Sequence, residues 1–224
     1  MSALLYLGNK NYSSWSLRPW LVLTWSGLPF TERIIPLGGE GYGKSQIPAV
    51  LAISPSGRVP ALTLTVSGVT LWDSLAISEW AAESAPAAHL WPEEPLARAV
   101  CRSVTCEMHS SFGALRRDLA MNIRRRATPR ALAPDTLADL TRIEALWAGT
   151  RERYGAGGPF LFGARTIADA FYAPVVTRLR TYGVPVQPAT QAYCDAVLAE
   201  PAFLAWETAA VAEPWTIPET EALY

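Results

Sequence analysis

The chain has few of the residues that build metal centres and disulfide frameworks. Its 224 residues include only three cysteines and two histidines. Cys101 and Cys106 are separated by four residues, and on a helix they would point to different sides. That arrangement suits neither a zinc site nor a dithiol redox centre. We therefore expect no metal, and we interpret these cysteines and Cys194 as small buried apolar residues.

Charge is also scarce, and neither sign dominates. Charged residues make up 17% of the chain, with a formal net charge of −1. This balance gives no general attraction to nucleic acid or to a membrane surface. The one basic cluster, Arg124 to Arg126 with Arg130, is short and lacks interleaved aromatic residues, so we interpret it as a solvated helix end. We expect no nucleic-acid partner and no membrane partner.

Long apolar runs and a leader pattern are missing as well. No run reaches the length of a transmembrane helix. The first residues, Met1-Ser2-Ala3, lack the basic start and the small-residue cleavage pattern of a signal peptide. We therefore expect a cytoplasmic protein. Apolar residues make up 50% of the chain, which is too many for a disordered protein and enough for a substantial core.

The residues that are present divide the chain in two. Up to about residue 85, strand-like and helix-like runs alternate in the order βαβ–α–ββα. That order predicts a small mixed sheet with a right-handed parallel crossover. The predicted strands cover residues 4–7, 30–35, 61–66 and 69–72, and the predicted helices cover 16–26, 47–53 and 74–83.

Residues 86–94 read as a linker, and the pattern changes after them. The β-branched alternation stops and helical periods take over, which predicts an all-helical domain over residues 95–224. Proline and glycine separate the predicted helices. These helices cover residues 95–126, 134–154, 166–182, 189–199 and a stretch near 203–210.

A pair of serines follows the first predicted strand. Ser13 and Ser14 lie at the turn into the first predicted helix, so their hydroxyls and the free backbone N–H groups meet at a helix N-terminus. An anion, such as a thiolate, is well held at such a place. The alternative is a plain helix cap, which is commoner than a catalytic serine. Asp73-Ser74, directly before another apolar-periodic helix, offers a second site of this kind.

Four segments carry a resemblance to a known family. They are Ser13-Ser14-Trp15-Ser16-Leu17-Arg18, Ser54-Pro55-Ser56-Gly57-Arg58-Val59-Pro60-Ala61-Leu62, Asp73-Ser74-Leu75-Ala76-Ile77 and the capping box Thr166-Ile167-Ala168-Asp169. Together, and in this order, they resemble the glutathione S-transferase superfamily, and the serine pattern is most similar to its zeta-like, maleylacetoacetate isomerase-like group. The resemblance implies an α/β thioredoxin-like domain at residues 1–85, a linker at 86–94 and an all-α helical domain at 95–224.

The resemblance also implies glutathione as the co-substrate, bound by the first domain. Ser74 and the first N–H groups of its helix would accept the γ-glutamyl carboxylate. Asp73, where the zeta-like group usually has glutamine, would help to hold the ammonium group across a subunit boundary. Val59-Pro60 would be a cis pair whose backbone pairs with the cysteinyl part of the ligand. The remaining predicted contacts are Trp15 and, near the glycyl end, Lys44, Ser45 and Arg58.

Ser13 and Ser14 are the predicted catalytic residues, because one of them would hold the glutathione thiolate. A thiol of pKa ~8.5 becomes mostly ionised at neutral pH when its pKa falls by roughly two units, or about 2.7 kcal/mol. One hydrogen bond to a charge contributes ~1.5–3 kcal/mol and a helix N-terminus ~0.3–1 kcal/mol. One hydroxyl at a helix end therefore suffices. The zeta-like pattern favours Ser13, although Ser14 is one step closer to the helix. Arg18 is expected to pair with the helical domain or with acidic groups.

Met108, Phe112 and Leu115 fall on one face of the first long helix of the second domain. With Tyr12 they form the predicted electrophile pocket, although such a stripe is more often core. His109 is expected to be a surface or satisfied histidine.

We therefore predict a glutathione S-transferase that adds the thiolate to a small hydrophobic electrophile. Trp15 stands where the zeta-like isomerases have cysteine. Isomerisation through a transient adduct is one alternative, and a non-catalytic module that binds another protein is a second. A disulfide reductase is the least favoured, because that chemistry needs a cysteine at the helix start. The resemblance implies a homodimer.

Overall fold

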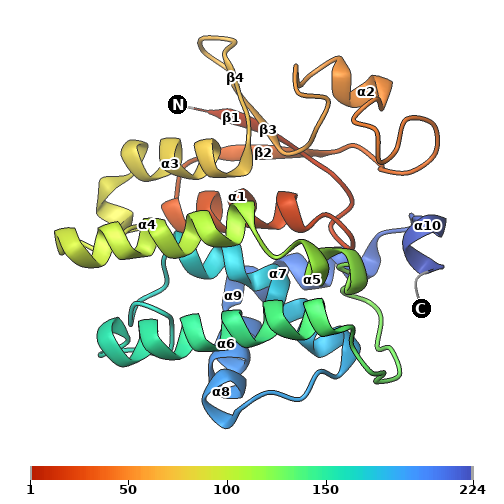
Figure 1. The fold of residues 1–224 in the computed structure, drawn as a ribbon. Helices are drawn as coiled ribbons and strands as arrows, with labels where there is room; N and C mark the ends of the chain where they lie inside the picture. Colours follow the sequence, from red (N-terminus) through yellow and green to blue (C-terminus); the bar gives the residue numbers. More distant parts are fainter. Residues whose placement is uncertain (1, 223–224) are drawn as a thin grey trace.

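The computed structural model describes residues 2–222, and its first part is built on a small sheet (Figure 1). The strand order is β2-β1-β3-β4. β1 pairs in parallel with β2, and the other two pairings are antiparallel. The predicted mixed sheet is therefore confirmed. The strands are β1 (Ala3–Leu7), β2 (Phe30–Ile34), β3 (Ala61–Leu64) and β4 (Thr70–Leu71).

The helices of the first part are α1 (Ser14–Ser26), α2 (Pro48–Leu51) and α3 (Ser74–Ser84). α1 starts two residues before the predicted start, because Ser13 is its N-cap and accepts a hydrogen bond from the backbone N–H of Ser16. It ends at Gly27, whose φ of 70° is a left-handed conformation that glycine adopts without strain. Figure 1 shows α1 between the sheet and α7, so this helix joins the two parts of the molecule.

The second part is helical, as predicted. After the short 3-10 turn Pro86–Ala88, which lies in the predicted linker, the chain as far as residue 222 forms helices and connecting segments, with isolated bridges near residue 160. The helices are α4 (Pro95–Ser110), α5 (Gly113–Asp118), α6 (Pro134–Tyr154), α7 (Ile167–Tyr182), α8 (Pro188–Leu198), α9 (Pro201–Ala212) and α10 (Pro218–Glu221).

The long helix predicted over residues 95–126 is wrong, because the chain breaks after Ser110. Phe112 adopts a left-handed φ of 63° and starts the separate helix α5. Partners from elsewhere satisfy the broken ends: Leu115 N–H donates to Asp139 Oδ2 of α6 at 2.9 Å, and Arg116 Nε donates to the carbonyl of Ser111 at 3.1 Å. Residues 119–126 then form an irregular connection with bends at residues 119, 123 and 124.

α7 is the centre of the core, and nearly every one of its residues is buried. The predicted capping box at its start is confirmed: Asp169 Oδ2 accepts from the backbone N–H of Thr166 at 2.7 Å. Asp169 also accepts from Leu161 N–H and from the Tyr193 hydroxyl, both at 3.1 Å. The buried apolar side chains of both parts form one continuous cluster, from Leu5 and Leu7 of β1 to Trp206 of α9.

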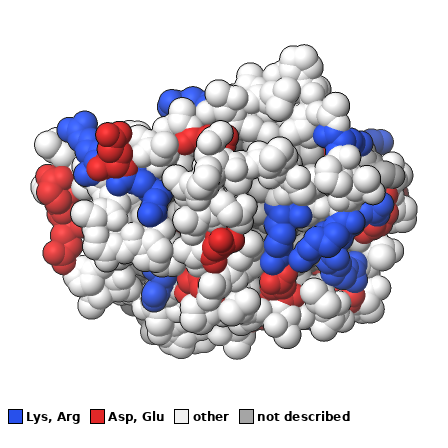
Figure 2. All heavy atoms as spheres, turned by 90° about the horizontal axis from the view of Figure 1, so that it is seen from below, with Lys and Arg blue, Asp and Glu red and all other residues white. Residues whose placement is uncertain are grey.

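Charge on the surface is paired rather than segregated. Figure 2 shows Lys and Arg atoms at both ends of the face seen from below, with the larger group at one end and Asp and Glu atoms beside both groups. Ion pairs such as Arg125–Glu221 at 2.9 Å join distant segments. Within residues 2–222, none of the helices combines the length and apolar character needed to span a bilayer. The same residues contain no group of three or more His, Cys, Asp or Glu side chains arranged to hold a metal ion.

Candidate active site

The candidate site is a cavity of about 640 Å³ beside the N-termini of α1 and α3. This volume is in the range of small-molecule sites. Four segments of the first part form most of its wall, and one residue of α4 completes it. The predicted site residues on its wall are Tyr12, Ser13, Ser14, Trp15, Ser45, Arg58, Val59, Pro60, Asp73 and Ser74. Lys44 is exposed and is not among the lining residues.

The two serines at the start of α1 have different surroundings. The Ser13 hydroxyl donates to Ser16 Oγ at 2.8 Å, and Ser16 Oγ in turn accepts from the backbone N–H of Gly8 at 3.0 Å. Ser13 is therefore committed to holding the strand-to-helix turn. Ser14 is buried on the cavity wall, and its hydroxyl has no hydrogen-bond partner among residues 2–222. Of the two hydroxyls, the one free to bind a ligand is that of Ser14.

Ser74 provides a second free hydroxyl at a helix N-terminus. Its side chain is 0% exposed, and its Oγ has no hydrogen-bond partner in the described part of the chain. The N-cap before it, Asp73, accepts from the backbone N–H of Leu75 at 2.9 Å. A buried hydroxyl without a partner is costly unless a ligand satisfies it. The start of α3 is therefore suited to a carboxylate, which also matches the positive end of the helix dipole.

His109 joins the two parts of the molecule at the cavity. Its Nε2 lies 3.1 Å from Asp73 Oδ2, and its ring meets the Trp15 ring edge-on with centroids 5.4 Å apart. The hydrogen bond from His109 is the main reason that the pKa of Asp73 is lowered to about 2, helped by the N–H groups of Leu75 and Ala76. The expectation of a surface or satisfied histidine missed this position, because no local pattern places residue 109 against the start of α3.

Two loops meet at the far end of the cavity. Arg58 Nε donates to Ser45 Oγ at 2.9 Å, so these two predicted residues do come together. Between them, Gly57 has a φ of 65°, and a Cβ added there would lie 2.1 Å from the carbonyl oxygen of Ser45. Only glycine allows this close approach. The peptide bond between Val59 and Pro60 is cis, as the motif predicts.

A smaller cavity of about 200 Å³ adjoins the first and shares part of its wall. The shared residues are Tyr12, Ser14, Trp15 and Tyr42, and the further walls are Arg116, Ala120, Met121, Arg178 and Thr220. The neighbouring space is therefore cationic.

The predicted apolar stripe lies elsewhere. Met108, Phe112 and Leu115 are buried in the core and line neither cavity. The break after Ser110 removes them from one continuous helix face, so of the predicted electrophile pocket only Tyr12 lies at the site. Arg116 and Arg178, which do line the second cavity, come from α5 and α7, and nothing in their local sequence marks them.

Comparisons with known proteins agree with this arrangement. Residues 12–84 match the model of the glutathione S-transferase N-terminal domain, and residues 112–209 match that of the C-terminal domain. The chain belongs to the glutathione S-transferase family. The superfamily indicated by the sequence motifs is thereby confirmed.

Curated relatives of this family member are maleylacetoacetate isomerases. The protein from Rattus norvegicus is 25% identical over 227 residues, covering 97% of this chain and 95% of that protein. The protein from Pseudomonas aeruginosa is 35% identical over 114 residues, covering 49% of this chain and 52% of that protein.

Solved structures share the fold. A glutathione transferase homologue from Burkholderia with bound glutathione is 24% identical, with a TM-score of 0.69 and coverage of 94% of this chain and 98% of that one. A maleyl pyruvate isomerase described as zeta class is 21% identical, with a TM-score of 0.65 and the same coverage.

Proposed function

We propose that this glutathione S-transferase family member is a glutathione-dependent enzyme that adds the thiolate to a carboxylate-bearing electrophile. One observation carries the proposal: the free hydroxyl of Ser14 lies on the wall shared by two cavities, and the second of these is lined by Arg116 and Arg178. The solved relatives from Burkholderia and from a sphingomonad hold glutathione.

Glutathione would occupy the larger cavity from the start of α3 to the loops at its far end. Ser74 and the N-terminus of α3 would take the γ-glutamyl carboxylate, and Asp73 the ammonium group. Val59 would meet the cysteinyl backbone, and Ser45 and Arg58 the glycyl end. The thiol would then lie at Ser14, with its hydroxyl donating to the thiolate and the N-terminus of α1 favouring the negative charge.

The acceptor would enter the smaller cavity, where a guanidinium is suited to a carboxylate. Arg178 is held rigidly, since its Nε and Nη1 donate to the carbonyls of Leu119 and Pro174 at 2.6 and 2.9 Å. Arg116 has a buried Nη1 without a partner in the described chain. This acceptor differs from the hydrophobic electrophile expected from the sequence.

The net reaction that these groups support best is isomerisation of a cis double bond conjugated to a carbonyl. The thiolate sulfur bonds to one alkene carbon, and the π electrons move to the carbonyl oxygen as an enolate, beside the two arginines. The former double bond rotates. The enolate electrons then re-form the double bond and expel the thiolate, so glutathione is regenerated. Conjugation would end instead with protonation of the enolate. The curated relatives, all maleylacetoacetate isomerases, favour the first outcome.

Ser14→Ala tests the proposal, with Ser13→Ala as the matched control. We expect Ser14→Ala to raise the thiol pKa of bound glutathione by roughly two units and to slow turnover at pH 7 by about 10- to 100-fold. The thiolate absorbance measured against pH gives the pKa, and proton NMR of maleylacetoacetate with glutathione gives the product. A shift only in Ser13→Ala would move the role to Ser13. No shift in either variant would reject the mechanism, and accumulation of a conjugate would reject isomerisation.

The homodimer implied by the sequence motifs remains part of this proposal. Large apolar side chains are exposed along the β3–β4 hairpin and at the start of α3, among them Val66 at 84% and Trp72 at 47% exposure. Exposed apolar groups clustered in this way are typical of an interface. Trp72 directly precedes Asp73, so a partner subunit packed here would also cover one end of the glutathione site.

A further inference from the structure

Trp15 is surrounded by buried nitrogen atoms that have no hydrogen-bond partner. Within residues 2–222 these are all three guanidinium nitrogens of Arg18, Nη1 of Arg116 and Nδ1 of His109. The three side chains contact the same indole: the Trp15 ring centroid lies 4.3 Å from Arg18 Cζ, 5.0 Å from Arg116 Cζ and 5.4 Å from the His109 centroid. The expected ion pair of Arg18 is therefore absent from the described chain.

Arg18 is the least satisfied of the three. It is 0% exposed, and its guanidinium lies between the Trp15 ring and the Phe171 ring, 5.0 Å from the latter. Burial lowers the pKa of Arg18 well below its ordinary value, and the positive charges of Arg116 and Arg178 lower it further. The nearby carboxylate of Asp73 already accepts from His109 and Leu75. Contact with aromatic faces does not replace hydrogen bonds to a buried charge.

The Trp15 indole covers this guanidinium on the side of the two cavities. Trp15 lines both cavities and is 37% exposed, whereas Arg18 lines neither. A half-exposed side chain can change rotamer without disturbing the core. Such a change would connect Arg18 to the cavity that already contains Arg116 and Arg178.

We propose that Arg18 is the inner end of an anion-binding subsite, and that the Trp15 indole is the gate that closes it. The ligand is a small carboxylate, which must displace the indole from the guanidinium before it can bind there. Trp15 therefore determines which acceptors bind, because its indole occupies the position on the Arg18 guanidinium that a ligand carboxylate would take. This inference rests on the proposed function, because the subsite opens into the proposed acceptor cavity.

Maleate titrated by calorimetry tests the gate, with the protein saturated by S-methylglutathione so that no thiol can react. We expect Trp15→Ala to bind maleate about tenfold more tightly than the unchanged chain, and Trp15→Phe to lie between the two. Arg18→Met should lose this gain in the Trp15→Ala background, while Arg18→Lys should keep part of it. Equal maleate affinity in the unchanged chain, Trp15→Ala and the double variant would overturn the proposal.

A second measurement keeps the test decisive if Arg18→Met does not fold. Phenylglyoxal modifies accessible arginines, and peptide mass spectrometry locates the adducts. We expect Arg18 to be protected in the unchanged chain, modified in Trp15→Ala, and protected again by maleate. Failure of Trp15→Ala to expose Arg18 would overturn the gate. Failure of S-methylglutathione to bind would instead count against the proposed function. The phenylglyoxal experiment does not need S-methylglutathione, so it would still test the gate.

Discussion

Ser14 and Ser74 share a property that marks the site at the residue scale. Each is a buried residue in the first turn of a helix, on the cavity wall, and its hydroxyl has no hydrogen-bond partner in residues 2–222. The Ser74 hydroxyl is fully buried as well, and leaving such a group unpaired costs about 1–3 kcal/mol. A ligand that pairs with Ser74 would recover this free energy, so we expect the charged groups of the proposed ligand to lie at the two serines.

Ser74→Ala should weaken glutathione binding. The variant removes a donor to the ligand carboxylate without breaking a hydrogen bond inside the protein, because Ser74 Oγ makes none in the described chain. A bond to a charged group contributes ~1.5–3 kcal/mol, so we expect the dissociation constant to rise by roughly 10- to 100-fold. Calorimetry measures it. Ser84→Ala, at the exposed other end of α3, is the control. Equal affinity in all three proteins would contradict this role for Ser74.

Asp73 should remain ionised far into the acid range. Its folded pKa is lowered to about 2, mainly by His109, and its unfolded pKa is ~3.9. A depressed pKa contributes stability that is present above the unfolded value and is lost as the pH falls through the folded value. The stability difference between the unchanged chain and Asp73→Asn should therefore be constant from pH 7 to about 5 and shrink between about 4 and 2. Urea unfolding at each pH measures it, and a constant difference down to pH 2 would show that the pairing is absent.

The sequence predicted the site residues that are adjacent in the chain at helix N-termini. It missed the site residues that the helical part contributes. Ser13 is the N-cap of α1, and Ser14 and Ser74 are the first residues of α1 and α3, positions that a short-range sequence pattern reveals. Arg116, Arg178 and His109 reach the cavities from the helical part, more than thirty residues from the nearest motif of the first part. Their positions depend on how α4, α5 and α7 pack, and local spacing carries no information about that packing.

At the scale of elements, the capping box of α7 and the break after α4 show the same contrast. Thr166 and Asp169 are three residues apart, and both hydrogen bonds of the box form between them. The box was therefore predictable. The break at Phe112 is stabilised by Asp139 of α6, which caps α5 from outside, and the apolar spacing of the segment gave no sign of it.

Asp169→Ala should destabilise the protein by about 2 kcal/mol or more. The change leaves the buried N–H groups of Leu161 and Thr166 and the Tyr193 hydroxyl without their acceptor. Urea unfolding followed by circular dichroism measures the loss. Asp195→Ala, on α8, is a control of the same chemistry. If the two variants had the same free energy of unfolding, the capping box would not contribute to the stability of the protein.

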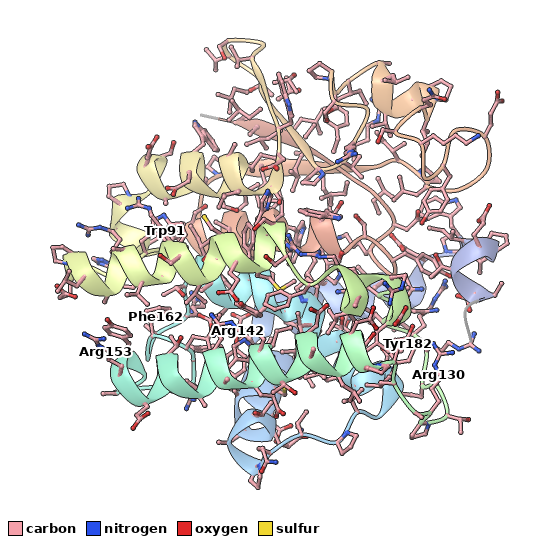
Figure 3. The ribbon with its side chains drawn as sticks, viewed as in Figure 1. Trp91, Arg130, Arg142, Arg153, Phe162 and Tyr182 are labelled. Carbon is pink, nitrogen blue, oxygen red and sulfur yellow. The ribbon has the colours of Figure 1, made fainter. Side chains whose placement is uncertain are left out.

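At the scale of the whole molecule, the two parts share one core and one site. The C-terminal segment returns to the first part, where the Glu213 carboxylate accepts from the backbone N–H groups of Lys10 and Asn11 at 2.7 and 3.1 Å. Glu221 accepts from the Tyr12 hydroxyl at 2.6 Å, directly before the serine pair. Figure 3 shows how densely side chains fill the layer between α1, α4 and α6. The alternation of element types in the sequence predicted two parts, but not that a tail would tie them together.

Trp72→Arg should convert the proposed dimer into monomers. A charge introduced at this half-exposed apolar position would be buried without a partner in the interface, which is strongly unfavourable. Sedimentation velocity measures the mass of the species, and Leu204→Arg, an equally exposed position on α9, is the control. If both variants were dimers, the interface would lie elsewhere on the surface. If the unchanged chain were a monomer, the proposed dimer would be wrong.

The two parts of the chain contribute different residues to the two cavities, so the proposed glutathione site and the proposed acceptor site can change separately. The serines and Asp73 come from residues before 85, whereas Arg116 and Arg178 come from the helical part. Consider a chimera that keeps the first part and takes its helical part from a relative. We expect it to bind glutathione with the same affinity and to have the relative's specificity for electrophiles. Exchange of the helical part near residue 85 would then change the electrophile without changing the thiol that attacks it.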